Sequence, residues 1–80
     1  MKYFVEFVVS SLVQYAEEVD VQETQTDTTL AYHIHLNPAD IGRVIGKKGR
    51  TIGAIRNLVN AANTREGKRI LVEVVDEAGF

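Results

Sequence analysis

The chain has 80 residues, enough for one small domain, and its 45% hydrophobic and 25% charged residues are typical of a folded, soluble protein. It contains no cysteine, which excludes a disulfide framework, and no apolar run reaches the roughly 20 residues that a membrane-spanning helix needs. The net charge of −2 excludes a protein coated uniformly in basic residues.

Residues 3–17 are predicted to form the first helix. Apolar residues recur there with the 3.6-residue period of one buried face: Val5, Val8, Val9, Leu12, Val13 and Ala16. Phe4 and Phe7 widen this stripe, and their exposure would indicate a surface for a protein partner. Glu6 interrupts the apolar run and argues against a cleaved secretory signal, so we expect a cytoplasmic protein.

Residues 19–26 and 29–36 are predicted to form two strands of a hairpin, joined by a turn at residues 26–28. The first strand loses its apolar residues after Val21, which is typical of a strand at the edge of a sheet. The second alternates cleanly, with Leu30, Tyr32, Ile34 and Leu36 facing the core and Ala31, His33 and His35 facing outward.

Two helices and a final strand follow the hairpin. Asn37 is a suitable N-cap and Pro38 a suitable first residue for a helix that ends at Gly46, and Asp40 lies in its first turn, where the helix dipole favours an acid. The second helix is predicted over residues 50–62, ending near Asn63, with a polar connection at residues 65–68. Residues 69–75 are almost uniformly apolar, which favours a strand covered on more than one side. Residues 76–80 are expected to form a flexible tail.

The loop Gly46-Lys47-Lys48-Gly49 separates these two helices. Two glycines let the backbone turn sharply and approach a partner without interference from a Cβ atom, and two lysines add positive charge. The next helix begins at once, so its free N–H groups lie close to the same point. Five cations and no acid occur in residues 41–56, whereas six acids and no cation occur in residues 6–27. This asymmetry indicates one face that holds an anionic polymer.

The motif Ile-Gly-x-x-Ile-Gly-x-x-Gly-x-x-Ile is complete here, in residues 41–52. It resembles the signature of the K-homology (KH) family, in which a GXXG loop grips a nucleic-acid backbone. The resemblance covers the whole chain, because the order α-β-β-α-α-β is similar to type II KH domains and most similar to small bacterial single-domain KH proteins. It implies an α+β fold, with a three-stranded mixed sheet covered on one face by three helices. We therefore treat residues 1–80 as a single KH domain.

The resemblance also implies a function in single-stranded RNA binding, with the loop clamping phosphates and an adjacent apolar groove receiving bases. The RNA-binding residues expected on this basis are Gly42, Arg43, Ile45, Gly46, Lys47, Lys48, Gly49 and Arg50. Arg56 lies further along its helix and is expected in solvent. Val44, Ile45, Ile70 and Val72 are candidates for the groove, although most of them also fit the core. Gly42 and Gly53 would allow close approach of a nucleic acid or of a neighbouring element, or are simply tolerated glycines.

The small bacterial KH proteins imply a post-transcriptional regulator or RNA chaperone linked to growth and cell shape. They also imply a homodimer, or a heterodimer with a larger KH-containing protein. The alternative function is a protein–protein interaction module whose helix–loop–helix face meets another KH domain, with RNA binding secondary. We predict no enzyme activity and no cofactor. We predict no metal site either, because His33 and His35 share one strand face without a third ligand.

Overall fold

The computed structural model describes residues 2–62 and 67–75 of the chain. Its elements are α1 (Lys2–Ser10), the 3₁₀ helix η1 (Ala16–Glu18), β1 (Asp20–Gln25), β2 (Thr29–His35), α2 (Pro38–Ile45), the 3₁₀ turn η2 (Lys47–Gly49), α3 (Arg50–Ala62) and β3 (Arg69–Val75). The predicted α+β class and the order of helices and strands are confirmed. The predictions made for residues 63–66 and 76–80 lie outside the described residues.

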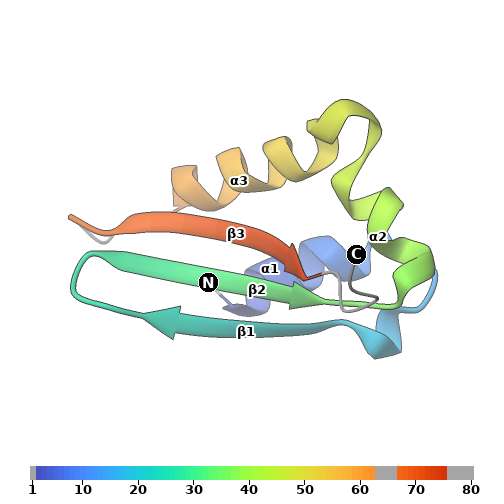
Figure 1. Ribbon diagram of the computed structural model, residues 1–80, viewed down its shortest axis with the longest axis horizontal. Helices are drawn as coiled ribbons and strands as arrows, with labels where there is room; N and C mark the ends of the chain where they lie inside the picture. The colour runs from blue at the N-terminus through green and yellow to red at the C-terminus, as the bar shows by residue number, and fades with distance from the viewer. Residues whose placement is uncertain (1, 63–66, 76–80) are drawn as a thin grey trace.

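The sheet has the strand order β1-β2-β3 and mixed directions (Figure 1). β1 pairs with β2 antiparallel, from Asp20 opposite His35 to Gln25 opposite Leu30. β2 pairs with β3 in parallel, from Thr29 opposite Arg69 to His35 opposite Val75. Because parallel neighbours cannot be joined by a tight turn, the α2–α3 pair forms the crossover between them. This connection places α2 and the loop after it at the end of the sheet where β2 ends (Figure 1).

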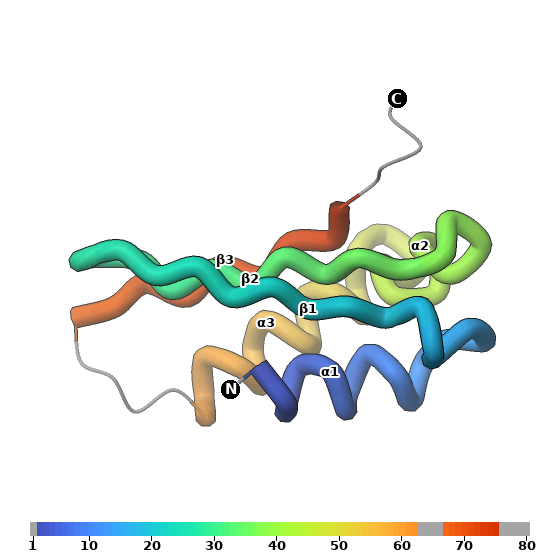
Figure 2. The backbone as a smooth tube through the Cα atoms, turned by 90° about the horizontal axis from the view of Figure 1, so that it is seen from below, coloured from blue at the N-terminus to red at the C-terminus, as the bar shows by residue number. Residues whose placement is uncertain are grey.

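The core lies between one face of the sheet and the helices. Figure 2 shows α1 and α3 together on that face, with the opposite face uncovered. The buried apolar side chains come from all three α-helices and all three strands: Val5, Val9, Val21, Leu30, Tyr32, Ile34, Val44, Ile52, Ile55, Val59, Ile70 and Val72. The inward residues predicted for the hairpin are therefore confirmed, with Leu36 only partly buried at its end.

The first helix is shorter than predicted. α1 ends at Ser10, and the following backbone turns away: the Ser11 hydroxyl donates to the Val8 carbonyl, and Leu12 N–H donates to Val9 rather than to residue 8. The N–H groups of Gln14 and Tyr15 donate to a side chain of α2 instead of to helical carbonyls. Leu12 and Ala16 are consequently exposed rather than part of a buried helical stripe.

The last strand has the predicted bounds but not the predicted environment. Ile70 and Val72 are buried, whereas Leu71, which points to the uncovered face of the sheet, is 39% exposed. β3 is thus covered on one face only, and the prediction of cover on more than one side is wrong. On the open face, Nδ1 of His33 lies 3.7 Å from a carboxylate oxygen of Glu73, its register partner.

Candidate nucleic-acid interface

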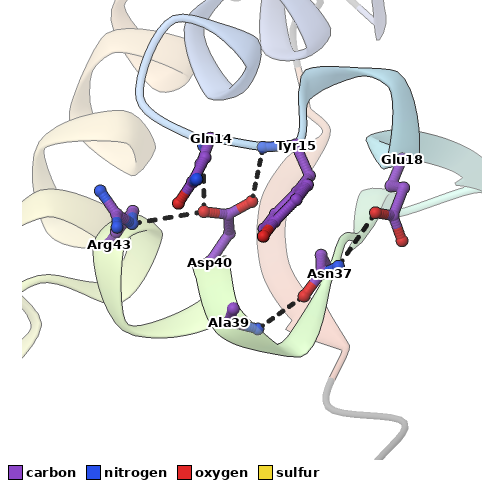
Figure 3. Close-up of polar contacts among 7 residues, drawn as sticks. All are labelled: Gln14, Tyr15, Glu18, Asn37, Ala39, Asp40 and Arg43. Atoms are coloured by element: carbon purple, nitrogen blue, oxygen red, sulfur yellow. Dashed lines mark hydrogen bonds and ion pairs between the residues drawn. The ribbon is translucent and has the colours of Figure 1, made fainter.

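The start of α2 is fixed by its cap. The side chain of Asn37 accepts a hydrogen bond from Ala39 N–H at 2.8 Å, and Pro38 occupies the first turn, as predicted. The side-chain Nδ2 atom of Asn37 also donates a hydrogen bond to the carboxylate of Glu18 at 2.9 Å, and this bond connects η1 to the start of α2 (Figure 3). These contacts fix the direction in which α2 leaves the sheet.

Asp40 anchors α2 from inside the protein. Its carboxylate is completely buried and accepts hydrogen bonds from Gln14 N–H and Tyr15 N–H, each at 3.0 Å. Its Oδ1 atom also lies 3.3 Å from Nε of Arg43, one turn along the helix (Figure 3). A buried carboxylate is tolerated only with such partners. The sequence suggested only a favourable interaction with the helix dipole, and no local signal pointed to partners 25 and 26 residues away.

The loop after α2 has a backbone that only particular residues allow. Gly46 has φ 77°, and a Cβ atom there would lie 2.2 Å from the Thr51 hydroxyl oxygen, so glycine is required. Gly49 also has a positive φ of 74°, and Lys48 has φ 58°, which is uncommon for a residue with a side chain. The predicted sharp turn is therefore present, and a single 3₁₀ turn over residues 47–49 forms it.

The loop offers unused donors to solvent. Both lysine side chains are exposed, and among residues 2–62 and 67–75 neither makes an ion pair or hydrogen bond, nor does the side chain of Arg50. The N–H groups of Lys47 and Lys48 likewise make no hydrogen bond to another described residue, whereas Gly49 N–H donates to Gly46. A helical residue followed by a left-handed one turns successive amides toward a common point, which favours an anion. The loop therefore combines free amides, ammonium groups and the start of α3.

The other glycines near the loop are open. A Cβ atom at Gly42 or Gly53 would meet nothing within 4 Å. No neighbouring element in the described part of the chain therefore requires a glycine at position 42. Two explanations for this glycine remain: it allows a bound molecule to approach closely, or it is simply tolerated in the helix. Arg43 lies one residue further, with a side chain 57% exposed although Asp40 holds its Nε.

A groove of about 350 Å³ lies beside the loop, lined by Ile45, Ile52, Arg56, Glu73 and Val74. Of the four groove candidates from the sequence, Ile45 lines it, whereas Val44, Ile70 and Val72 are buried in the core. Sequence periodicity gave no means of finding Ile52 and Val74, because both also fit a buried face. The groove joins α2, α3 and the outer edge of β3, at the end of the sheet that carries the loop.

Arg56 is exposed to solvent, as expected, but its side chain also contacts the sheet. Its Nε donates to the backbone carbonyl of Val72 at 3.1 Å, which joins α3 to the outer edge of β3. The interaction places a guanidinium group in the wall of the groove.

Comparison with known proteins identifies the family. A family model described as "KhpA/KhpB, KH domain" matches residues 2–74. The chain belongs to the KhpA/KhpB family of KH domains. The RNA-binding protein KhpA of Oceanobacillus iheyensis is 41% identical over 75 residues, which cover 94% of this chain and 100% of the relative. KhpA of Chlamydia trachomatis is 39% identical over 77 residues, covering 96% and 99%, and KhpA of Listeria monocytogenes is 41% identical over 69 residues, covering 86% and 91%.

The KhpA/KhpB assignment agrees with the α-β-β-α-α-β order and the mixed sheet, which are those of the type II KH arrangement. The loop of residues 46–49 lies between α2 and α3, the two helices of the crossover. Within the described residues, no helix is both long and apolar enough to cross a membrane.

Proposed function

We propose that this protein binds single-stranded RNA, with the loop of residues 46–49 holding the phosphate backbone. The observation that carries this proposal is the set of exposed donors on the loop, two lysine side chains and two backbone N–H groups, that have no partner among the described residues. Relatives over nearly the full chain are named RNA-binding proteins. A phosphodiester supplies the acceptor oxygens and the negative charge that such a group of donors fits.

The proposed interface uses the residues named from the sequence in three ways. Lys47, Lys48 and Arg50 contact phosphates, with Arg43 at the margin because Asp40 holds one of its nitrogens. Gly42, Gly46 and Gly49 allow close approach of the strand, and Ile45 contributes to the groove that receives a base. KH domains hold about four nucleotides in this way. The protein acts as a cytoplasmic regulator or chaperone of RNA, without catalysis.

Salt dependence of binding tests this proposal. With two to four phosphates neutralised, raising KCl from about 50 mM to about 200 mM is expected to weaken binding about 7- to 50-fold, because condensed ions compete with the protein. Fluorescence anisotropy of a labelled single-stranded oligoribonucleotide measures the dissociation constant. The same strand annealed to its complement is the control and should bind more weakly, since a paired base cannot enter the groove. Salt-independent binding, or tighter binding of the duplex, would contradict the proposal.

A protein–protein interaction module is the alternative function. In that case the helix–loop–helix face meets another KH domain and RNA binding is secondary. The ammonium groups of Lys47 and Lys48, which have no partner among the described residues, favour RNA binding as the main function. Charged residues, lysine among them, are depleted at the centre of stable protein–protein interfaces. A dimer that is lost on changing the loop, with RNA affinity retained, would establish the alternative instead.

We further propose that a second KH domain, in another copy of this chain or in a larger protein, pairs with the outer face of α1. Tyr3 and Phe7 are 79% and 74% exposed and lie four residues apart on one side of the helix. Phe4 on α1 and Leu58 on α3 are also exposed. Figure 2 shows the N-terminal part of α1 away from α2 and the loop. Pairing there leaves both RNA sites free, and two weak sites on one assembly raise the avidity.

The change Phe7→Ser is expected to shift the protein toward monomer by about tenfold or more in dimer dissociation constant, because a largely exposed aromatic contributes to association and little to folding. Sedimentation equilibrium measures this constant. Leu71→Ser is the matched control, since it removes an exposed apolar side chain from the opposite face of the sheet. Equal behaviour of the two variants would contradict the assignment of the interface to α1.

A further inference from the structure

Arg56 is held in one orientation, and this leaves part of its guanidinium group unused. The bond from Nε to the Val72 carbonyl consumes one of its five N–H donors. Among the described residues Arg56 makes no ion pair, and the carboxylate of Glu73, which also lines the groove, lies 3.7 Å from Nδ1 of His33. The two terminal amino groups therefore remain available at the wall of the groove.

The backbone groups of β3 that face the groove can be assigned from its hydrogen bonds. Arg69 N–H donates to Thr28, on the side of β2, whereas the Val72 carbonyl accepts from Arg56 on the opposite side. Successive residues of a strand alternate between the two edges, so residue 74 presents its backbone to the same edge as residue 72. The strand carbonyl nearest Arg56 is already occupied. The charged donors in the groove wall are thus those of Arg56, and the apolar walls come from Ile45, Ile52 and Val74.

We propose that Arg56 makes the groove selective for a base with two adjacent hydrogen-bond acceptors, which means cytosine or guanine. This inference rests on the proposed RNA binding. The terminal amino groups of arginine form a planar fork that donates two parallel hydrogen bonds. Cytosine offers N3 beside O2, and guanine offers N7 beside O6. Adenine and uracil place a donor beside each acceptor on the corresponding edges, so one arm of the fork would face another N–H group. The groove rejects them for this reason.

The size and character of the groove fit a single base. A volume of about 350 Å³ is at the lower end of the range for small-molecule sites. Its apolar walls suit the faces of a heterocycle, while Arg56 supplies the polar contact at the edge. In contrast, the loop contacts only the sugar–phosphate chain and carries no sequence information. Base preference and overall affinity therefore reside in different residues and can be measured separately.

The experiment compares four labelled single-stranded oligoribonucleotides of equal length: oligo-C, oligo-A, oligo-U and a UG repeat. The wild-type protein is expected to bind oligo-C, the UG repeat or both about tenfold or more tightly than oligo-A and oligo-U, as a bidentate pair discriminates between bases. The two favoured arms distinguish cytosine from guanine. Arg56→Gln, which removes the fork, is expected to bring all four affinities within about twofold of one another. It should weaken binding of the favoured strands much more than binding of oligo-U, because only the favoured bases accept two hydrogen bonds from the fork.

Arg56→Lys is the second variant, since it keeps the charge but loses the planar fork. It should lose base preference while keeping the slope of affinity against salt. A parallel fall of all four affinities with their ratios unchanged would show a purely structural role and overturn the inference, as would a wild-type preference for oligo-A or oligo-U. Equal wild-type binding of all four strands would overturn this inference alone. Failure to bind any strand would overturn the proposed function with it. Circular dichroism of both variants checks that they are folded. If either variant unfolds, the ratios of the wild-type affinities for the four strands test the proposed base selectivity.

Discussion

Reversing both loop charges, Lys47→Asp together with Lys48→Asp, is expected to weaken RNA binding about 100-fold or more and to leave the fold intact. Each ammonium group bound to a phosphate contributes on the order of 1.5 kcal/mol, and a carboxylate in its place repels the strand. Neither lysine side chain has a partner in the described part of the chain, so the change removes nothing that holds the protein together. Lys48 has φ 58°, a conformation that aspartate tolerates better than most residues.

The control for this experiment is Lys2→Asp with Arg69→Asp, which changes the net charge by the same amount. Lys2 begins α1 and Arg69 begins β3, and Figure 1 shows the start of β3 at the end of the sheet remote from α2. Anisotropy with a single-stranded oligoribonucleotide measures both double variants. Comparable losses in the two would indicate general electrostatic attraction rather than a site. Full RNA binding by the loop variant, combined with loss of the dimer, would support the protein-interaction alternative.

Replacing the buried anchor of α2, Asp40→Ala, is expected to lower the free energy of unfolding by about 3–5 kcal/mol. The change leaves the N–H groups of Gln14 and Tyr15 without an acceptor and the Arg43 guanidinium without its counter-charge. Because a domain of this size has a total stability of roughly 5–10 kcal/mol, the variant should be only marginally folded. Urea unfolding followed by circular dichroism measures the difference.

Asp20→Ala provides the comparison for Asp40. Asp20 is exposed at the start of β1, and within the described part of the chain its carboxylate accepts one hydrogen bond, at 3.3 Å from the Gln22 side chain. Its removal should therefore cost less than about 0.5 kcal/mol. Asp40→Asn should fall between the two, since its amide oxygen keeps one N–H group satisfied while its NH₂ group faces another donor. Identical unfolding midpoints for the alanine variants at positions 40 and 20 would show that the buried carboxylate does not anchor α2.

Local signals predicted most elements of the fold because each signal acts through its immediate neighbours. The cap at Asn37, the helix end at Gly46 and the bounds of α3 and β3 are all confirmed. The cap is a hydrogen bond across two residues, and the helix end is a backbone conformation that glycine adopts without strain. The hairpin followed from period-two alternation, which one buried face of a sheet imposes.

The failures share a physical cause, which is competition from distant residues. The helical pattern of residues 3–17 continued past the true end at Ser10, because Asp40 captures the backbone N–H groups of Gln14 and Tyr15. The apolar run in β3 suggested cover on both faces, although the helices lie on one face of the sheet only (Figure 2) and Leu71 is 39% exposed. Hydrophobicity alone reports that a residue prefers burial, and the rest of the chain decides whether cover exists.

The candidate site also has a part that local sequence predicts and a part that depends on distant residues. The loop was predictable because its glycines, lysines and flanking apolar residues all lie within twelve positions of the chain. The groove was only partly predictable, because its walls come from α2, α3 and β3 and meet only through the crossover. Arg56 illustrates the limit: it is exposed as expected, but its contact with Val72 spans sixteen residues, and no pattern in the sequence indicates that contact.

A titration of isotope-labelled protein with a single-stranded oligoribonucleotide, followed by the backbone amide resonances in NMR spectra, tests the central claim most directly. Binding through the loop predicts that the largest, saturable shifts belong to the amides of residues 46–50, with smaller shifts at Ile45, Ile52 and Val74 along the groove. Unchanged loop resonances, with saturable shifts confined to α1 or to the open face of the sheet, would contradict it.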